Sequence, residues 1–265
     1  TLLARLTARL IDADFSRIQF TPDLMPSDVL GTTVFNMKTN GFDFHQGPIF
    51  ADIVLVDEIN RAPAKTQAAL FEVMEERQVS IDGTTHRMGE LYTILATQNP
   101  VEQEGTYKLP EAQLDRFLMK ITMDYPSLEE EVNILERHHT NAALVKLEDV
   151  TPVLTREELL SLRALMSRVF VDRTLLQYIA LIVQQTRTSK AVYLGASPRA
   201  SVAMLQSSKA YALLQGRDFV TPEDIKFVAP YVLQHRLILT AEAEMEGYSP
   251  VKVTQRLIDK VEVPK

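Results

Sequence analysis

The sequence predicts an α/β domain built on a parallel β-sheet, followed by a smaller all-helical domain. Residues 53–56 (Ile-Val-Leu-Val) form an apolar run without polar alternation, which is typical of a parallel strand covered on both faces. Residues 91–96 form a second buried strand, and polar residues follow both runs. Strand patterns stop near residue 150, and helical spacing continues to the end. We therefore predict domains at residues 1–150 and 151–265.

The elements of the first domain can be placed in order from their periodicity and turn residues. They are a helix at 2–10, with Leu2, Leu3, Leu6 and Leu10 on one face, a strand at 17–20, a hairpin of 33–38 and 42–46, a strand at 53–58, a helix opening at Pro63, a hairpin of 79–81 and 85–88, and strands at 91–96 and 121–123. Asn40-Gly41 predicts a type I′ hairpin turn, because both central residues of that turn need positive φ, and Asp82-Gly83 predicts the second turn.

Capping signals locate the later helices. Ser127 and Thr155 are each followed three residues later by a glutamate, which forms a capping box. A further helix is predicted from Asp172 to Thr186. Two more begin at Ser197-Pro198 and Thr221-Pro222, where a hydroxyl N-cap precedes a proline in the first turn.

Composition excludes several classes of function. The net charge of -7 argues against a broad nucleic-acid-binding surface. The absence of cysteine excludes disulfides and thiol chemistry and fits a reducing, cytoplasmic location. No apolar run reaches membrane-spanning length. The chain begins with threonine and opens in a helical pattern, so we expect it to be part of a longer protein.

Polar residues at the strand ends suggest a site. In a parallel α/β sheet the ligand crevice lies beyond the carboxyl ends of the strands, where Asp57, Glu58 and Asn99 are expected. One carboxylate could hold a metal and the other could activate a water. The alternative is a strand that leaves the core into a charged turn, and residues 53–58 alone favour neither interpretation. Asn99 alone is better explained as a turn residue before Pro100.

Longer strings resemble the MoxR family of AAA+ ATPases over nearly the whole chain. They are residues 20–28, 57–65, 96–107 and 109–117, together with Gly195-Ala-Ser-Pro-Arg-Ala200, which is similar to the family's sensor 2 segment. Residues 53–58 resemble a Walker B strand, and Asn99 occupies the sensor 1 position. The resemblance implies a P-loop NTPase (AAA+) core with β-hairpin inserts and a helical lid, with ATP bound between them and hydrolysis moving the lid.

The resemblance also implies roles for the strand-end residues, with ATP and Mg²⁺ as the cofactors. Asp57 would hold Mg²⁺, with the Thr1 hydroxyl as a direct ligand. Glu58 would polarise the attacking water, and Asn99 would align that water and sense the γ-phosphate. Thr1 matches the last residue of the Walker A loop, whose glycines and lysine are absent. Without them, the present chain is not expected to hydrolyse ATP.

Two arginines complete the expected site. By resemblance, Arg116 is an arginine finger that reaches a neighbour's γ-phosphate, which implies a ring; the alternative is a solvated surface arginine. Arg199 has an independent basis, because the helix dipole disfavours a cation in the first turn of the helix after Ser197 and so suggests a bound anion. The alternative is an exposed arginine that the helix tolerates. Whether Arg199 acts on its own or a neighbour's nucleotide stays open.

The resemblance implies an ATP-hydrolysing, chaperone-like remodeller in maturation or assembly of other proteins. Its partners would be copies of itself in a hexameric ring, client proteins and a von Willebrand A domain protein. The two hairpins could grip a client, and for the one with Phe42 and Phe44 a plain surface hairpin explains the sequence equally well. Rival hypotheses are a magnesium-chelatase-like or nucleic-acid-acting AAA+ motor, and a nucleotide-free interaction module.

Overall fold

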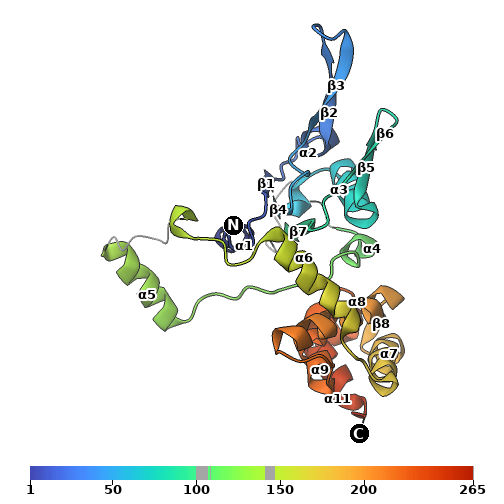
Figure 1. The fold of residues 1–265 in the computed structure, drawn as a ribbon. Coiled ribbons are helices and arrows are strands. Elements are labelled where there is room, and N and C mark those ends of the chain that lie inside the picture. The colour runs from blue at the N-terminus through green and yellow to red at the C-terminus, as the bar shows by residue number, and fades with distance from the viewer. Residues whose placement is uncertain (100–106, 108, 141–146, 265) are drawn as a thin grey trace. The chain divides into compact units, whose positions relative to one another are not determined.

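The computed structural model describes residues 1–99, 107, 109–140 and 147–264, which form two compact units (Figure 1). Residues 1–109 and 124–161 form the first unit, and residues 110–123 and 162–265 form the second. The predicted division at residue 150 stays a prediction, since the units are defined by packing and interleave along the chain. In the described part of the chain, no helix combines the length and apolar character that crossing a bilayer requires.

The core of the first unit is a three-stranded parallel sheet in the order β1–β4–β7. Its strands are β1 (Phe15–Gln19), β4 (Ile53–Asp57) and β7 (Thr93–Ala96). All five residues of the central strand β4 are buried, as its uninterrupted apolar run predicts. The register pairs Gln19 with Asp57 on one side and Val56 with Ala96 on the other, so the three strands end at the same edge.

The first unit also contains helices. They are α1 (Leu2–Leu10), α2 (Pro26–Leu30), η1 (Ile59–Arg61), α3 (Ala64–Glu76), α5 (Leu128–His139), η2 (Leu147–Asp149) and the first part of α6 (Arg156–Leu165). Arg156, at the start of α6, pairs with the buried Asp52 and with Asp14, so the beginning of α6 is anchored next to the sheet. The capping boxes predicted at Ser127 and Thr155 are both formed.

Helix α1 buries a different face from the one its leucines mark. Ala4 and Ala8, one turn apart, are buried, whereas Leu2 and Leu3 are exposed. The physical reason is that small side chains allow close packing. The periodicity therefore identifies the helix correctly but not its covered face.

Two hairpins extend from the first unit as arms (Figure 1). The first joins β2 (Gly31–Asn36) to β3 (Gly41–Gln46), and the second joins β5 (Gln78–Ile81) to β6 (Thr84–Arg87). Asp82 and Gly83 both have positive φ and form the predicted two-residue turn. The type I′ turn predicted at Asn40-Gly41 is wrong: Asn36 pairs with Gly41, so the connection is a four-residue loop.

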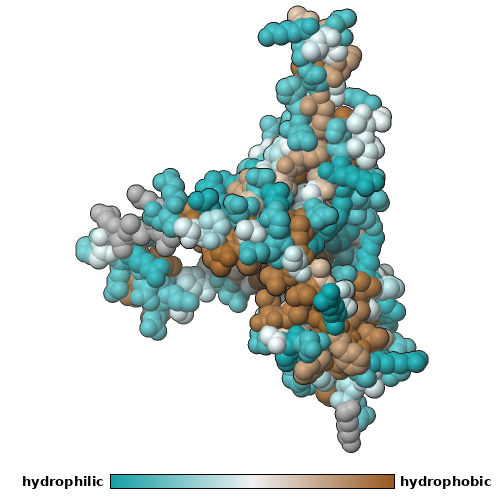
Figure 2. Space-filling view, viewed as in Figure 1, coloured by the Kyte–Doolittle hydropathy of each residue, from teal (hydrophilic) through white to brown (hydrophobic). Residues whose placement is uncertain are grey.

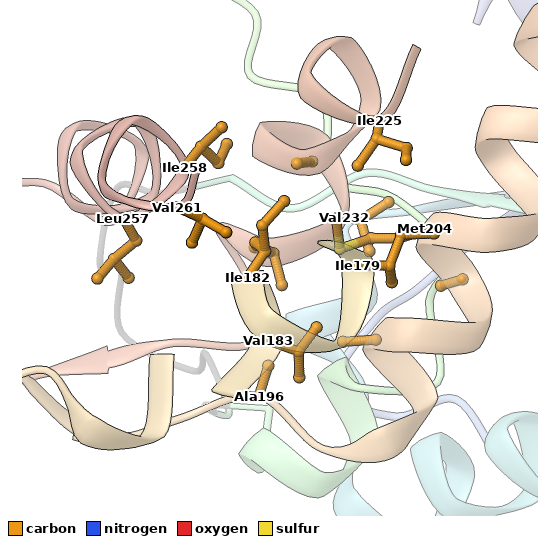
Figure 3. Close-up of a cluster of buried hydrophobic side chains, with 14 of the residues drawn as sticks. Ile179, Ile182, Val183, Ala196, Met204, Ile225, Val232, Leu257, Ile258 and Val261 are labelled. Atoms are coloured by element: carbon orange, nitrogen blue, oxygen red, sulfur yellow. The ribbon is translucent and has the colours of Figure 1, made fainter. Parts of the chain in front are cut away.

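The second unit is helical and also contains a small β pairing, between β8 and β9, that the sequence pattern does not predict. Its elements are α4 (Glu111–Leu114), the end of α6, η3 (Met166–Arg168), α7 (Arg173–Thr188), β8 (Val192–Leu194), α8 (Pro198–Leu214), α9 (Pro222–Leu233), β9 (Ile238–Leu239), α10 (Ala241–Met245) and α11 (Pro250–Lys260). Figure 3 shows apolar side chains of α7, α8, α9 and α11 meeting in one core, among them Ile182, Met204, Val232 and Ile258. The predicted caps at Asp172 and Ser197 are formed.

The strand predicted at residues 121–123 is not formed. The segment 110–123 packs in the second unit, where the Lys120 N–H donates to the Tyr231 carbonyl at 2.9 Å. Ile121 and Met123 are exposed. At Lys120 the backbone of this segment therefore pairs with α9.

Candidate functional site

The ends of β4 and β7 lie side by side and continue to hydrogen-bond beyond the last paired residues. The Thr97 N–H donates to the Val56 carbonyl at 2.8 Å, and the Ile59 N–H donates to the Thr97 carbonyl at 3.0 Å. Thr97 therefore lies between the two ends, next to Asp57 and Glu58. This is the sheet edge at which the sequence places the candidate site.

The Asp57 carboxylate is buried between side chains from both neighbouring segments. Its Oδ2 accepts from Arg17 Nε at 2.6 Å, and its Oδ1 accepts from Thr97 Oγ1 at 3.1 Å. A hydrogen bond from a guanidinium to a carboxylate is charge-assisted and therefore stronger than one between neutral groups. Sequence reasoning missed both partners. Arg17 lies 40 residues away in sequence, and only the strand order and register bring it to Asp57.

Glu58 leaves the strand in a left-handed conformation with a φ of 55°. This conformation is uncommon for residues other than glycine, and it is held in place by its neighbours. The Glu58 N–H donates to Thr97 Oγ1 at 3.0 Å, and the Glu58 carboxylate pairs with Arg61 at 3.0 Å within η1. One hydroxyl thus contacts both acidic positions, since it donates to Asp57 and accepts from Glu58.

Asn99 follows Thr97 by two residues and lies at the same edge. The side chain of the buried Asn60 donates from Nδ2 to the Asn99 carbonyl at 3.4 Å. Asn60 itself follows Glu58 by two residues, so this contact ties the two strand ends together again. The structure therefore brings the acid pair and Asn99 into one region. The next residues of the motif, 100–106, lie outside the described part of the chain.

Thr1 is the exposed N-cap residue of α1, and its carbonyl accepts from the Arg5 N–H at 3.1 Å. Its hydroxyl does not cap the helix. The predicted role of Thr1 as a metal ligand stays a prediction.

The donors at the strand edge fit Mg²⁺ in the way that this ion usually binds. Mg²⁺ commonly takes one or two carboxylates and completes its shell with water and substrate phosphates. An ionised carboxylate offers about four lone-pair positions, and Arg17 and Thr97 use one each, so Asp57 can still accept. The described residues contain no cluster of three or more His, Cys, Asp or Glu side chains that would form an all-protein metal site.

Arg116 and Arg199 lie in the second unit and are linked there through their neighbours. Arg199 lies in the first turn of α8, as predicted, and its backbone N–H donates to the capping Ser197 Oγ at 3.1 Å. Its side chain is exposed. The same hydroxyl donates to Asp115 Oδ2 at 2.8 Å, and Asp115 directly precedes Arg116. The structure therefore connects the two predicted anion-binding arginines through Asp115 and Ser197.

The hairpin aromatics divide into two groups. Phe35 and Phe42 are cross-strand partners with ring centroids 5.2 Å apart, and both are exposed. Phe44 instead packs on His86 of the second hairpin, with centroids 4.3 Å apart, and on Phe50. Figure 2 shows apolar residues among hydrophilic ones along the first arm. Phe44 thus has a structural role in joining the arms, whereas client contact by Phe42 stays a prediction.

Comparison with known proteins identifies the family. Residues 1–119 match the model of the ATPase family associated with various cellular activities (AAA), and residues 184–259 match the AAA lid domain. The chaperone MoxR1 of Mycobacterium tuberculosis is 43% identical over 274 residues, covering 100% of this chain and 71% of that protein. The chain belongs to the MoxR family of AAA+ ATPases.

Two other proteins are similar over the whole chain. The uncharacterized protein YeaC of Bacillus subtilis is 47% identical over 264 residues, covering 100% of this chain and 82% of YeaC. The crystal structure of a proposed ATPase from Cytophaga hutchinsonii superposes with a TM-score of 0.90 at 41% identity, covering 100% of this chain and 82% of that one. The fold is therefore that of an AAA+ ATPase with a parallel-sheet core and a helical lid. Membership supports ATPase activity, nucleotide and Mg²⁺ use, and oligomerisation in general terms.

Proposed function

We propose that this MoxR-family protein forms a chaperone-like hexameric ring that hydrolyses ATP with Mg²⁺. The ring uses the free energy of ATP hydrolysis to remodel client proteins during their maturation or assembly. The supporting observation is the pair of hydrogen bonds that the Thr97 hydroxyl makes to Asp57 and Glu58 at the edge of the sheet. A chaperone role is favoured by the name of the relative MoxR1. The client and a von Willebrand A domain partner belong to the same proposal.

Each residue at the edge has a role in the proposed reaction. Asp57 and Thr1 would hold Mg²⁺, which when bound neutralises charge on the phosphates. Glu58 orients the attacking water and accepts its proton. Asn99 can donate and accept through its amide and so aligns the water with the γ-phosphate. A phosphate-binding Walker A loop preceding Thr1 is part of the proposal, so its tests use the full-length protein.

The two arginines of the second unit supply positive charge for the transition state. Arg116 is proposed to reach the γ-phosphate bound by a neighbouring copy, which requires the ring. Arg199 is proposed to contact phosphate oxygens from the first turn of α8, where a bound anion offsets the unfavourable dipole.

Replacing Glu58 by glutamine tests the proposal. Glutamine keeps the size of the side chain but cannot accept a proton, so Glu58→Gln is expected to lower kcat for ATP about 100-fold or more while nucleotide still binds. Steady-state turnover and the binding of a fluorescent ATP analogue give the two quantities. Glu72→Gln, on the exposed side of α3, is the matched control and should turn over at the wild-type rate. Equal turnover in Glu58→Gln and wild type would remove Glu58 from the mechanism.

A further inference from the structure

Arg236 is a buried arginine that follows α9. Its donors all go to one short segment, residues 115–118, and to Val232 near the end of α9. Its side chain is 3% exposed. Nε donates to Asp115 Oδ1 at 2.8 Å, and Nη2 donates to the carbonyls of Asp115 and Phe117 at 3.0 and 2.6 Å. Nη1 donates to the carbonyls of Leu118, at 3.2 Å, and Val232. Each of the five N–H donors that a guanidinium carries is therefore used.

The residues beside Arg236 hold the same segment. His235 Nε2 donates to the Phe117 carbonyl at 3.0 Å, and Gln234 Nε2 donates to the Lys120 carbonyl. Backbone carbonyls on both sides of Arg116 are thus bound by three consecutive side chains at the end of α9. An irregular segment with this many side-chain contacts is fixed in one conformation.

The second oxygen of Asp115 extends this network to the other arginine. Asp115 Oδ2 accepts from Ser197 Oγ, and Ser197 Oγ in turn accepts from the Arg199 N–H. Asp115 therefore connects the end of α9, the residue before Arg116 and the N-terminus of α8. We refer to Asp115, Ser197 and Arg236 as the Asp115 network.

Stability alone gives little reason for such a network. Well-packed apolar residues often replace a buried ion pair without loss of stability, whereas removing one partner is strongly destabilising. A planar arginine with five donors in fixed directions does, however, hold the groups that it binds at defined positions. The same unit contains another arginine–aspartate pair, between the half-buried Arg217 and the buried Asp224, with contacts of 2.7 and 2.5 Å. Asp224 of that pair accepts from the backbone N–H and the hydroxyl of Thr221, so it holds the N-terminal cap of α9.

We propose that Asp115 and Arg236 are positioning residues that hold Arg116 and Arg199 at a fixed spacing, so that both arginines move as one body and meet nucleotide phosphates together. This inference rests on the proposed function, because it assigns phosphate binding to the two arginines. Asp115 and Arg236 touch no reacting atom. They act through the arginines that they hold.

The first test measures turnover in the full-length protein. Asp115→Asn keeps the shape of the side chain and removes the charge that pairs with Arg236. Misplacement of a catalytic group by about an ångström costs roughly 100-fold, so kcat should fall about 10- to 100-fold while KM for ATP changes less. Asp224→Asn removes the charge that pairs with Arg217 and is the matched control, with unchanged kcat at temperatures where it stays folded. Equal kcat values in the two variants would overturn the proposal.

A double-mutant cycle separates positioning from general destabilisation. Because Asp115 is proposed to act through both arginines, adding Asp115→Asn to the combined variant Arg116→Ala/Arg199→Ala should lower kcat by less than twofold further. Independent effects would multiply and contradict the proposal. Ser197→Ala removes both hydrogen bonds of the Ser197 hydroxyl, to Asp115 and from the Arg199 N–H, and Ser197→Thr retains a hydroxyl. Only the alanine variant is expected to lower kcat.

Amide hydrogen exchange tests the positioning role of the Asp115 network without depending on ATP hydrolysis. Backbone amides of residues 116–120 should exchange faster in Asp115→Asn than in wild type without nucleotide, and Asp224→Asn should leave them unchanged. Unchanged exchange in Asp115→Asn would overturn the positioning role even in an active ATPase. If wild type shows no ATP turnover, the proposed function fails. In that case, faster exchange in Asp115→Asn would still show that the Asp115 network holds residues 116–120. The proposed role of the network in phosphate binding would be overturned.

Discussion

The Thr97 hydroxyl donates to the Asp57 carboxylate and accepts from the Glu58 N–H, so one side chain sets both acidic positions. Thr97→Val keeps the shape of the side chain and removes both hydrogen bonds. We expect a stability loss of about 1 kcal/mol. We also expect kcat for ATP to fall about 10-fold or more, because Asp57 and Glu58 lose their common support. Thermal unfolding and steady-state turnover measure the two effects.

The matched variant for this prediction is Thr97→Ser, which retains the hydroxyl and should keep most of the activity. A valine variant with wild-type kcat would show that the hydroxyl does not position the acids.

His235 gives the second unit a dependence on pH. Burial lowers its pKa to about 4, assisted by the positive charges of Arg236 and Lys120, and its Nε2–H donates to the Phe117 carbonyl. The unfolded chain protonates this histidine near its ordinary pKa of 6.5. Between pH 6.5 and 4 the unfolded state therefore binds more protons, and stability falls as pH decreases. From pH 7 to pH 5 we expect a loss on the order of 2 kcal/mol from this group.

Replacing His235 by glutamine isolates this contribution. Glutamine can donate to the same carbonyl but does not titrate, so the unfolding free energy of His235→Gln should fall less steeply between pH 7 and pH 5 than that of wild type. Chemical denaturation at several pH values provides the comparison. Parallel curves for the two proteins would assign the acid sensitivity to other groups.

At the scale of elements, the start of α8 depends on a close approach to α7. A Cβ atom at Gly195 would lie 2.8 Å from backbone atoms of Arg187. The next residue is held from α7 as well, because the Ala196 N–H donates to Thr186 Oγ1 at 3.0 Å and its carbonyl accepts from Arg187 Nε at 2.9 Å. Gly195 thus allows the chain to enter α8 with Ser197 as its cap.

We therefore expect Gly195→Ala to destabilise the protein by about 1–3 kcal/mol, since one of the two backbones must shift. Thermal unfolding measures the loss. Gly216→Ala is an informative comparison, because a Cβ there meets nothing within 4 Å and its cost arises only from the positive φ of 73°. An unfolding temperature of Gly195→Ala equal to that of wild type would contradict the close packing.

The hairpins show how far turn chemistry can be predicted from sequence. Asp82-Gly83 adopts the expected two-residue turn. Asn40-Gly41 carries the same local preference, but the cross-strand pair of Phe35 and Phe42 accompanies a different register, which places Gly41 in the strand. A side-chain pair across the strands can outweigh a dipeptide preference. The outcome depends on contacts between residues that the turn signal does not include.

For the molecule as a whole, the predicted arginine finger requires a ring in which each copy completes its neighbour's site. Arg116→Ala and Glu58→Gln should each abolish most ATP turnover. Mixing the two full-length variants should restore activity, because a copy with an intact Glu58 can meet a neighbour with an intact Arg116. Random mixing would give about a quarter of the wild-type rate.

The mixed sample is compared with each variant alone at the same total concentration. A mixture no more active than the variants alone, in rings shown to exchange subunits by light scattering or native mass measurement, would place Arg116 outside a shared site.

The sequence predicts the site residues that directly follow the strands. It does not predict the residues that reach the site only through the pairing register of the sheet. Asp57, Glu58 and Asn99 follow apolar runs, and parallel strands bring their carboxyl ends together. Arg17 and Thr97 carry no such signal. Their contacts with Asp57 follow from the strand order β1–β4–β7 and from the pairing of Val56 with Ala96. The division between units is equally non-local, because the segment 110–123 is bound by side chains more than a hundred residues later.

The contact between Phe44 and His86, which connects the two hairpins, has a practical consequence for spectroscopy. This chain contains no cysteine, and Met37 in the loop of the first arm is 88% exposed. A cysteine placed there would give these 265 residues one attachment point for a fluorophore. Since Phe44 and His86 connect the arms, the anisotropy of a dye on one arm also reports on restraint imposed through the other.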